Sequence, residues 1–318
     1  MLRDSGKAVA ASVALGVVIA FLPLLSLIAV PAMLIPAALI TSRHGISAGL
    51  AVSLLAGAAC FVLTGIYAGL LIFLLAALAG AGSGLALRRD AREFRLFMVA
   101  AGLLAVVLGL WLGSVLLISG QGPVSAMQSL ADQTADSSRQ IYQAMGMSQQ
   151  DIDATLTDVS DFATALPYLA PAVLLVASVL FAGAFIAIAR RVFERAGTPF
   201  PRDFVFRDMR VHWAFAYATI AGFACLIYAY TVDGTGAEVV YLVGMNLLIA
   251  SGVMFFVQGL SVVSFTVWHF KLSRAKRAGI YAFVVVLEAF FYTTSLLGLF
   301  DIWFDFRRRL IGRKLTGH

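Results

Sequence analysis

The sequence predicts an all-α, polytopic membrane protein: a transmembrane helical bundle of about eight to nine membrane segments. Apolar residues make up 61% of the 318 residues and charged residues only 13%, whereas soluble domains carry roughly 25% charged residues. The mean hydropathy is +0.93. The apolar residues also fall in runs that approach or exceed the roughly 20 residues needed to cross a bilayer core as a helix. Water-soluble enzyme folds, disordered proteins and secreted disulfide scaffolds are therefore excluded.

Eight apolar runs qualify as candidate spans. They cover residues 8–41, 46–63, 66–87, 97–119, 167–189, 211–231, 238–266 and 280–300. The first run contains Pro23, Pro31 and Pro36, and it is too long for one ordinary span yet short for two. It therefore predicts a broken or re-entrant segment, or two short helices. A break at membrane depth requires that protein or water satisfies the freed backbone groups.

Basic residues gather in three short loops, at 88–95, 190–210 and 271–277. The positive-inside rule places these loops in the cytoplasm, and in a bacterium the expected location of the protein is then the inner membrane. The net charge of +6 thus reflects topology, and no nucleic-acid binding is expected. One conflict remains: two crossings in the first run put the C-terminus outside, yet the tail at 307–314 is basic. Either the run at 280–300 does not cross simply, or another segment is re-entrant, or the tail breaks the rule.

The segment 121–166 has the opposite charge and predicts a periplasmic amphipathic helical hairpin. It carries a single basic residue, Arg139, against the acidic residues Asp132, Asp136, Asp151, Asp153, Asp158 and Asp161. Apolar residues recur at helical spacing at Ile152, Leu156, Val159, Phe162 and Leu166, and more loosely from Met127 through Leu130 and Thr134 to Ile141 and Met145. Gly146 can end the first helix, and Ser148 with Asp151 resembles a capping box. The hairpin is either a structured lid or spacer, or a partner-docking arm.

These patterns divide the chain into four segments. The segments are an N-terminal membrane bundle at 1–120, the hairpin at 121–166, a C-terminal membrane bundle at 167–300 and a basic tail at 301–318.

Glu288 is the most informative single residue. Among 23 basic and 17 acidic residues, it alone falls in the middle of a predicted span. A charge there costs roughly 2.5 kcal/mol or more, so such a residue is neutral, paired or faces a cavity. On a continuous helix, Tyr281, Glu288, Tyr292 and Ser295 share one face. Glu288 is thus either a ligand- or proton-binding position or the source of an interhelical hydrogen bond.

Other polar residues carry weaker signals. Asn246 and Gln258 lie in the preceding span, where amides bind ligands or join helices by hydrogen bonds. The sequence contains no HxxxH or HExxH pattern and no nucleotide-binding loop, so neither a metal nor a cofactor is expected. Acid–base catalysis usually needs two positioned groups, and only one acid lies at depth, so no enzymatic activity is predicted.

Three short stretches carry a resemblance to a known family. They are Pro31–Pro36 followed by Arg43-His44-Gly45, the span of Asn246 that continues into Gln258–Val263, and Leu297–Asp301 with Asp305-Phe306-Arg307. With these, the chain resembles the YybS-like family of bacterial membrane proteins, which is distantly similar to the substrate-capture (S) components of energy-coupling-factor transporters. The chain departs from the compact six-helix S component in having more spans and an Asp-rich outer segment.

The resemblance gives some weight to Asp301 and Arg307. Their alternative roles are to end the last helix and to anchor it at the membrane interface.

Two functions follow as hypotheses. In the first, the protein is a small-solute transporter component whose ligand-binding residues are Glu288, Tyr292, Asn246, Gln258 and Asp301. A separate ATPase module would then contact the basic residues Arg88, Arg89, Arg92, Arg190 and Arg191. In the second, the protein is a non-transporting membrane scaffold or assembly factor that binds partners through its periplasmic hairpin.

Overall fold

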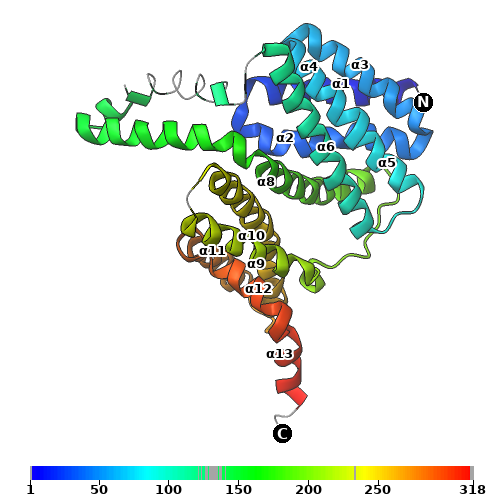
Figure 1. Cartoon of the computed structure of the whole chain (residues 1–318). Helices are drawn as coiled ribbons and strands as arrows, with labels where there is room; N and C mark the ends of the chain where they lie inside the picture. The colour runs from blue at the N-terminus through cyan, green and yellow to red at the C-terminus, as the bar shows by residue number, and fades with distance from the viewer. Residues whose placement is uncertain are drawn as a thin grey trace. The chain divides into compact units, whose positions relative to one another are not determined.

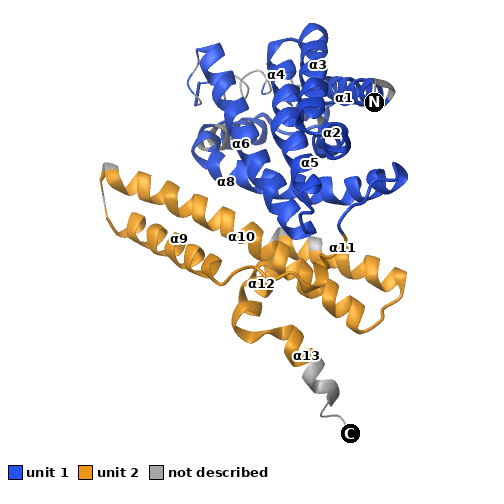
Figure 2. Cartoon of the chain, turned by 90° about the vertical axis from the view of Figure 1, so that its right-hand side faces the viewer, with its two compact units in different colours: residues 1–201 blue, residues 202–318 orange. Residues whose placement is uncertain are grey.

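The structure, a computed structural model, describes residues 2–120, 122, 124–125, 128, 135, 138–139, 141–232 and 234–315. All regular elements in these residues are helices, as predicted (Figure 1). Eight of the described helical segments are long and apolar enough to cross a membrane, and one further bent pair of helices could form a ninth span. The chain divides into two compact units, unit 1 at Met1–Pro201 and unit 2 at Arg202–His318 (Figure 2).

Unit 1 contains six of the candidate spans found in the described residues. Its elements are α1 (Leu2–Phe21), α2 (Pro23–His44), α3 (Ile46–Thr64), α4 (Ile66–Leu74), the π-helix η1 (Leu75–Gly80), α5 (Ala81–Arg88), α6 (Glu93–Ser119) and α8 (Gln149–Arg195). The first apolar run forms two helices that meet at Leu22, with Pro23 in the first turn of α2. Proline is tolerated there because the first turn has no N–H partner to lose. Of the alternatives open from the sequence, two helices is the one observed.

The core of unit 1 forms where α2 packs against the π-helical turn η1. Met33 and Leu34 of α2 are fully buried there with Leu75 of η1. Glycines permit the close approach: a Cβ on Gly80 would lie 2.9 Å from the Leu34 carbonyl oxygen, and one on Gly84 would lie 2.5 Å from that of Ala38. Gly80 and Gly84, four residues apart, are therefore used for packing within the chain.

Helix α8 continues without a break from the predicted hairpin into the membrane span at Leu166–Arg195. The predicted cap is confirmed, because the Asp151 backbone N–H donates to Ser148 Oγ at 3.2 Å. Gly146 has the expected left-handed backbone, with φ of 81°. Arg139 pairs with Asp153 at 3.2 Å, which joins the segments before and after this turn. Three of the loosely spaced hairpin residues, Met127, Leu130 and Thr134, lie outside the described residues.

The compact units divide the chain differently from the predicted segments. The expected boundary at 167 falls inside α8, and α8 packs against α2 and α6. Its span therefore belongs to unit 1, and the predicted C-terminal bundle at 167–300 is not one body. Apolar periodicity identifies a span, but only packing shows which other spans it joins.

Unit 2 contains the 3₁₀ turn η2 (Phe206–Asp208) and the helices α9 (Ala214–Thr231), α10 (Thr235–His269), α11 (Arg274–Phe291), α12 (Thr293–Phe304) and α13 (Phe306–Leu315). The predicted span at 280–300 is broken. Tyr292 has a left-handed backbone, with φ of 50°, and α11 and α12 meet at an angle of 98°. The run therefore forms two short helices instead of one straight span.

Helix α12 crosses α10 where Gly298 meets Phe255 and Gly259 meets Thr294. The Ser295 hydroxyl donates to the Gly252 carbonyl oxygen, and the Gln258 amide donates to Asp301. The start of α13 lies at the loop 206–211, because Arg307 donates to the Arg207 carbonyl oxygen, and the Arg207 guanidinium lies 4.1 Å from the centre of the Trp268 ring near the end of α10. We call this the basic end of unit 2, which comprises the loop 206–211, the turn 268–277 and residues 305–310. This arrangement supports the alternative in which the run at 280–300 does not cross the membrane as one simple span.

We predict that the C-terminus and the loop 190–210 lie on the same side of the membrane, because Arg307 at the start of the basic tail donates to the Arg207 carbonyl oxygen in the 206–211 loop. Alkaline phosphatase and green fluorescent protein fused after residue 200 and after residue 318 should report the same side. A fusion after residue 147 serves as the control and should report the opposite side. Opposite sides for positions 200 and 318 would show that the α11–α12 pair crosses the membrane.

A second prediction concerns the α10–α12 crossing, where a Cβ on Gly298 would lie 1.9 Å from the Phe255 carbonyl oxygen. Gly298→Ala should destabilise unit 2 by about 1–3 kcal/mol, because overpacking forces the helices apart. The control is Gly252→Ala in α10, where no described atom lies within 4 Å of the added Cβ. Thermal unfolding of the purified protein in detergent measures both, and equal midpoints for the two variants would contradict the close crossing.

Candidate functional site

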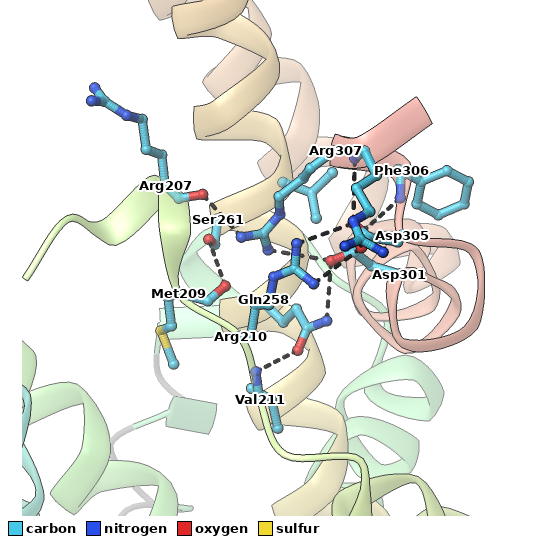
Figure 3. A network of polar contacts seen from close by, with 12 residues as sticks. Arg207, Met209, Arg210, Val211, Gln258, Ser261, Asp301, Asp305, Phe306 and Arg307 are labelled. Atoms are coloured by element: carbon cyan, nitrogen blue, oxygen red, sulfur yellow. Dashed lines mark hydrogen bonds and ion pairs between the residues drawn. The ribbon is translucent and has the colours of Figure 1, made fainter. Parts of the chain in front are cut away.

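A buried polar network lies at the basic end of unit 2 (Figure 3). We call it the basic-end network and define it by the side chains of Gln258, Ser261, Asp301 and Arg307 together with the loop 206–211. Gln258 and Ser261 lie one turn apart on α10, Asp301 lies in the last turn of α12, and Arg307 lies in the first turn of α13. All four side chains are buried.

An ion pair between Asp301 and Arg307 forms the centre of this network. Asp301 Oδ2 lies 3.3 Å from Arg307 Nη2, and the two side chains are only 3% and 4% exposed. The Gln258 amide donates to the same oxygen at 3.2 Å. The backbone N–H of Phe306 donates to Asp301 Oδ1 at 3.0 Å. A buried ion pair needs such additional hydrogen bonds, because the desolvation cost otherwise exceeds the attraction between the charges.

The same residues hold the 206–211 loop against α10 and α13. Gln258 Oε1 accepts the Val211 backbone N–H at 2.8 Å, so this amide side chain joins the loop to Asp301. The Ser261 hydroxyl donates to the carbonyl oxygens of Phe206 and Met209, and Arg307 Nη1 donates to that of Arg207 at 3.0 Å. One network therefore fixes the loop, α10, α12 and the start of α13 together.

The outer edge of the network is charged and more exposed. Arg210 donates to both oxygens of Asp305, each at 3.1 Å. Partial burial alone would raise the pKa of Asp305, but the guanidinium groups of Arg210 and Arg308 outweigh it and hold the pKa below its usual value. Burial lowers the pKa of Arg307, and the nearby Asp301 charge opposes this change. Arg307 Nε has no hydrogen-bond partner among the described residues.

Glu288 lies at the break between α11 and α12, and its carboxylate caps α12. Glu288 Oε2 accepts the backbone N–H groups of Thr294 at 2.7 Å and Ser295 at 3.2 Å, and Oε1 accepts the Ser295 hydroxyl. The N-terminal end of a helix carries partial positive charge, so this position stabilises a carboxylate. The structure therefore shows the intramembrane acid bound to the protein's own backbone.

The predicted polar face of Tyr281, Glu288, Tyr292 and Ser295 is interrupted at Tyr292. The continuous helix assumed for that face ends at Phe291, so Ser295 belongs to α12 and Tyr292 is 71% exposed at the break. Glu288 still meets Ser295, but through the cap and not along one helix face. The left-handed backbone of Tyr292 is the physical reason for the difference.

Of the five predicted ligand-binding residues, the structure brings Gln258 and Asp301 together. Asn246 is half-buried, and its side-chain amide donates to the Leu242 carbonyl oxygen at 2.9 Å within the same helix. Ser261 and the loop 206–211 were missed in the sequence. The spacing of Ser261 three residues after Gln258 was the available signal, because such residues lie on one side of a helix.

The predicted contact arginines lie in unit 1. Arg88, Arg89, Arg92 and Arg191 are exposed. Arg190 is half-buried and pairs with the buried carboxylate of Glu93, so it joins α8 to α6. No group of three or more His, Cys, Asp or Glu side chains able to hold a metal ion occurs in the described part of the chain.

We predict that Asp301→Asn destabilises unit 2 by about 3–5 kcal/mol, because it leaves Arg307 as a buried charge without its counter-ion. Arg210→Gln is the matched control. Arg210 is 58% exposed in its pair with Asp305, and exposed pairs are worth less than about 1 kcal/mol. Thermal unfolding in detergent should show a much larger loss for Asp301→Asn. Equal losses would mean that the buried pair does not hold unit 2 together.

The chain was compared with known families, curated proteins and solved structures. A family model described as "Predicted membrane protein (DUF2232)" matches residues 10–302. No curated protein and no solved structure matches the chain. The matched region includes seven of the eight candidate spans in full, most of the span at Asp4–Phe21, and the break at Tyr292. The chain therefore belongs to the DUF2232 family of predicted membrane proteins.

Proposed function

We propose that this protein is a small-solute transporter component of the bacterial inner membrane, similar to an S component. The observation that carries the proposal is the discontinuous helix α11–α12, whose break holds the carboxylate of Glu288. Transporters commonly build their binding sites from broken membrane helices, whose N-terminal ends attract anionic groups of the substrate. In this chain an internal carboxylate occupies that position.

The geometry supports a binding role for the α12 N-terminus. A carboxylate or phosphate group of a solute offers the same acceptors as Glu288 and can replace it at the backbone N–H groups of Thr294 and Ser295. Such a replacement frees α11 from α12, while the basic-end network holds the other end of α12. The break thus acts as a hinge. The Glu288 cap at the start of α12 can be exchanged, whereas the basic-end network fixes the end of α12.

Unit 1 supports the same proposal from another direction. Its described residues contain six candidate spans, the number in a compact S component. It also presents the exposed Arg88, Arg89, Arg92 and Arg191 at helix ends. We propose that these residues form the contact with an energising ATPase module and that the α11–α12 hinge binds the solute.

The test compares solute uptake in cells that carry the wild-type chain, no chain, or Glu288→Gln. Metabolite profiling should identify a solute that accumulates only with the wild-type chain, and Glu288→Gln should lower this accumulation at least ten-fold because the cap and the binding position are altered together. Glu238→Gln, at an exposed acid at the start of α10, is the control and should leave uptake unchanged. Immunoblots of membranes must show equal amounts of each variant.

Normal uptake by Glu288→Gln would remove this residue from the binding site. Identical solute contents with and without the chain would reject the transporter role.

A second function is favoured by the arm of α8. The helix is 47 residues long, and its part at 149–165 extends beyond the candidate span (Figure 1). Close to this arm, Ile141 and Met145 are exposed. A non-transporting scaffold that binds a partner through this arm would account for such a surface. Unchanged solute contents, combined with loss of a co-purified membrane partner on deletion of residues 124–164, would favour this function over transport.

A further inference from the structure

An apolar groove opens at the basic end of unit 2. Its volume is about 530 Å³, which lies in the range of small-molecule sites. Four elements line it. Its residues are Val262, Val263, Thr266 and Val267 of α10, Ile280 of α11, Leu297 of α12, and Phe306, Arg309 and Leu310 of α13. Arg309 is the single charged residue among these, so the groove combines a long apolar wall with one guanidinium group.

The left-handed turn at Asp305 builds one wall of this groove. With φ of 40°, Asp305 ends α12 and redirects the chain into α13. Asp301 accepts the Phe306 N–H and thereby fixes the start of α13. Phe306, Arg309 and Leu310 are three and four residues apart, so they lie on one face of α13. This face is the one that lines the groove.

Arg309 is available for an external anion. It is exposed, and no acidic side chain in the described part of the chain forms an ion pair with it. Its guanidinium lies 5.3 Å from the centre of the Phe304 ring, and the Arg309 side chain also lines the groove. The neighbouring Arg308, in contrast, is 86% exposed and lies 3.8 Å from the Asp305 carboxylate. Arg308 thus lies near a carboxylate, whereas Arg309 lines the groove.

The surroundings have the character of a membrane–water interface. Exposed aromatic side chains occur at Trp268, Phe270, Trp303 and Phe304. The basic residues Lys271, Arg274, Lys276 and Arg277 follow α10 directly. Aromatic residues gather at the headgroup level of a bilayer, and clusters of four or more basic residues beside a span attract anionic lipids.

We infer that this groove binds one anionic phospholipid, with an acyl chain along the apolar wall and the headgroup phosphate at Arg309. A guanidinium binds phosphate through two parallel hydrogen bonds, so Arg309 fixes the position of the headgroup phosphate. The apolar wall offers an acyl chain a contact that a free phosphate ion cannot use, which favours a lipid as the occupant. A zwitterionic lipid offers the same chain, but its choline group opposes the excess of positive charge at this end.

Native mass spectrometry of the purified full-length chain tests this inference. Dioleoyl phosphatidylglycerol and dioleoyl phosphatidylcholine are added in equal amounts, and the lipid retained after detergent release is counted. The wild-type chain should retain one phosphatidylglycerol at least five-fold more often than phosphatidylcholine. Arg309→Gln should lower phosphatidylglycerol retention about five-fold, the effect of one interfacial charge. Arg308→Gln is the matched control and should retain the lipid as the wild-type chain does.

A second variant tests the acyl-chain part of the site. Val263→Trp fills the groove and should lower the retention of both lipids equally, whereas Arg309→Gln should lower the retention of phosphatidylglycerol more than that of phosphatidylcholine. Equal phosphatidylglycerol retention by Arg309→Gln and the wild-type chain would overturn the inference. So would a wild-type chain without preference between the lipids. Because Arg309 is exposed, its substitution leaves the fold of unit 2 intact and the comparison interpretable.

Discussion

Polar groups that are freed inside an apolar environment must find partners within the protein, and unit 2 is organised by this constraint. A break in a membrane helix exposes backbone N–H and C=O groups that lipid cannot satisfy. At the α11–α12 break, the carboxylate of Glu288 binds two such N–H groups. At the α12–α13 break, Asp301 binds the Phe306 N–H. Each acidic side chain of the chain's last membrane segment thus stabilises a helix end.

The buried pair of Asp301 and Arg307 extends this constraint to the 206–211 loop. A carboxylate in this position needs a cation, and Arg307 reaches it only because the chain turns at Asp305. Arg307 Nη1 also donates to the Arg207 carbonyl oxygen, and Gln258 Oε1 accepts the Val211 backbone N–H. The loop between α8 and α9 is therefore held by the residues that hold α12. Because these contacts share the same side chains, a change in one of them alters the others.

The sequence predicted much of the membrane architecture because the relevant signals are local. Long apolar runs identified the spans, and the cap at Ser148 with the turn at Gly146 was visible in neighbouring residues. The break at Tyr292 could not be predicted in this way. It follows Ala289-Phe290-Phe291, a stretch without proline or glycine, and a left-handed tyrosine is uncommon. The Glu288 cap and the α10–α12 crossing hold it in place, and both are contacts that form only in the folded chain.

By itself, the sequence determined that the chain is a membrane protein with many candidate spans, where most of these spans lie to within a few residues, and which residues are too polar to face lipid. Those properties depend on the transfer of side chains from water to hydrocarbon, which composition alone describes. Only the tertiary structure decided that Glu288 caps a helix, that Gln258 and Asp301 meet while Asn246 and Tyr292 lie elsewhere, and that α8 joins unit 1. Those outcomes depend on backbone direction at single residues and on close approach at glycines, which are properties of paired helices and not of any one span.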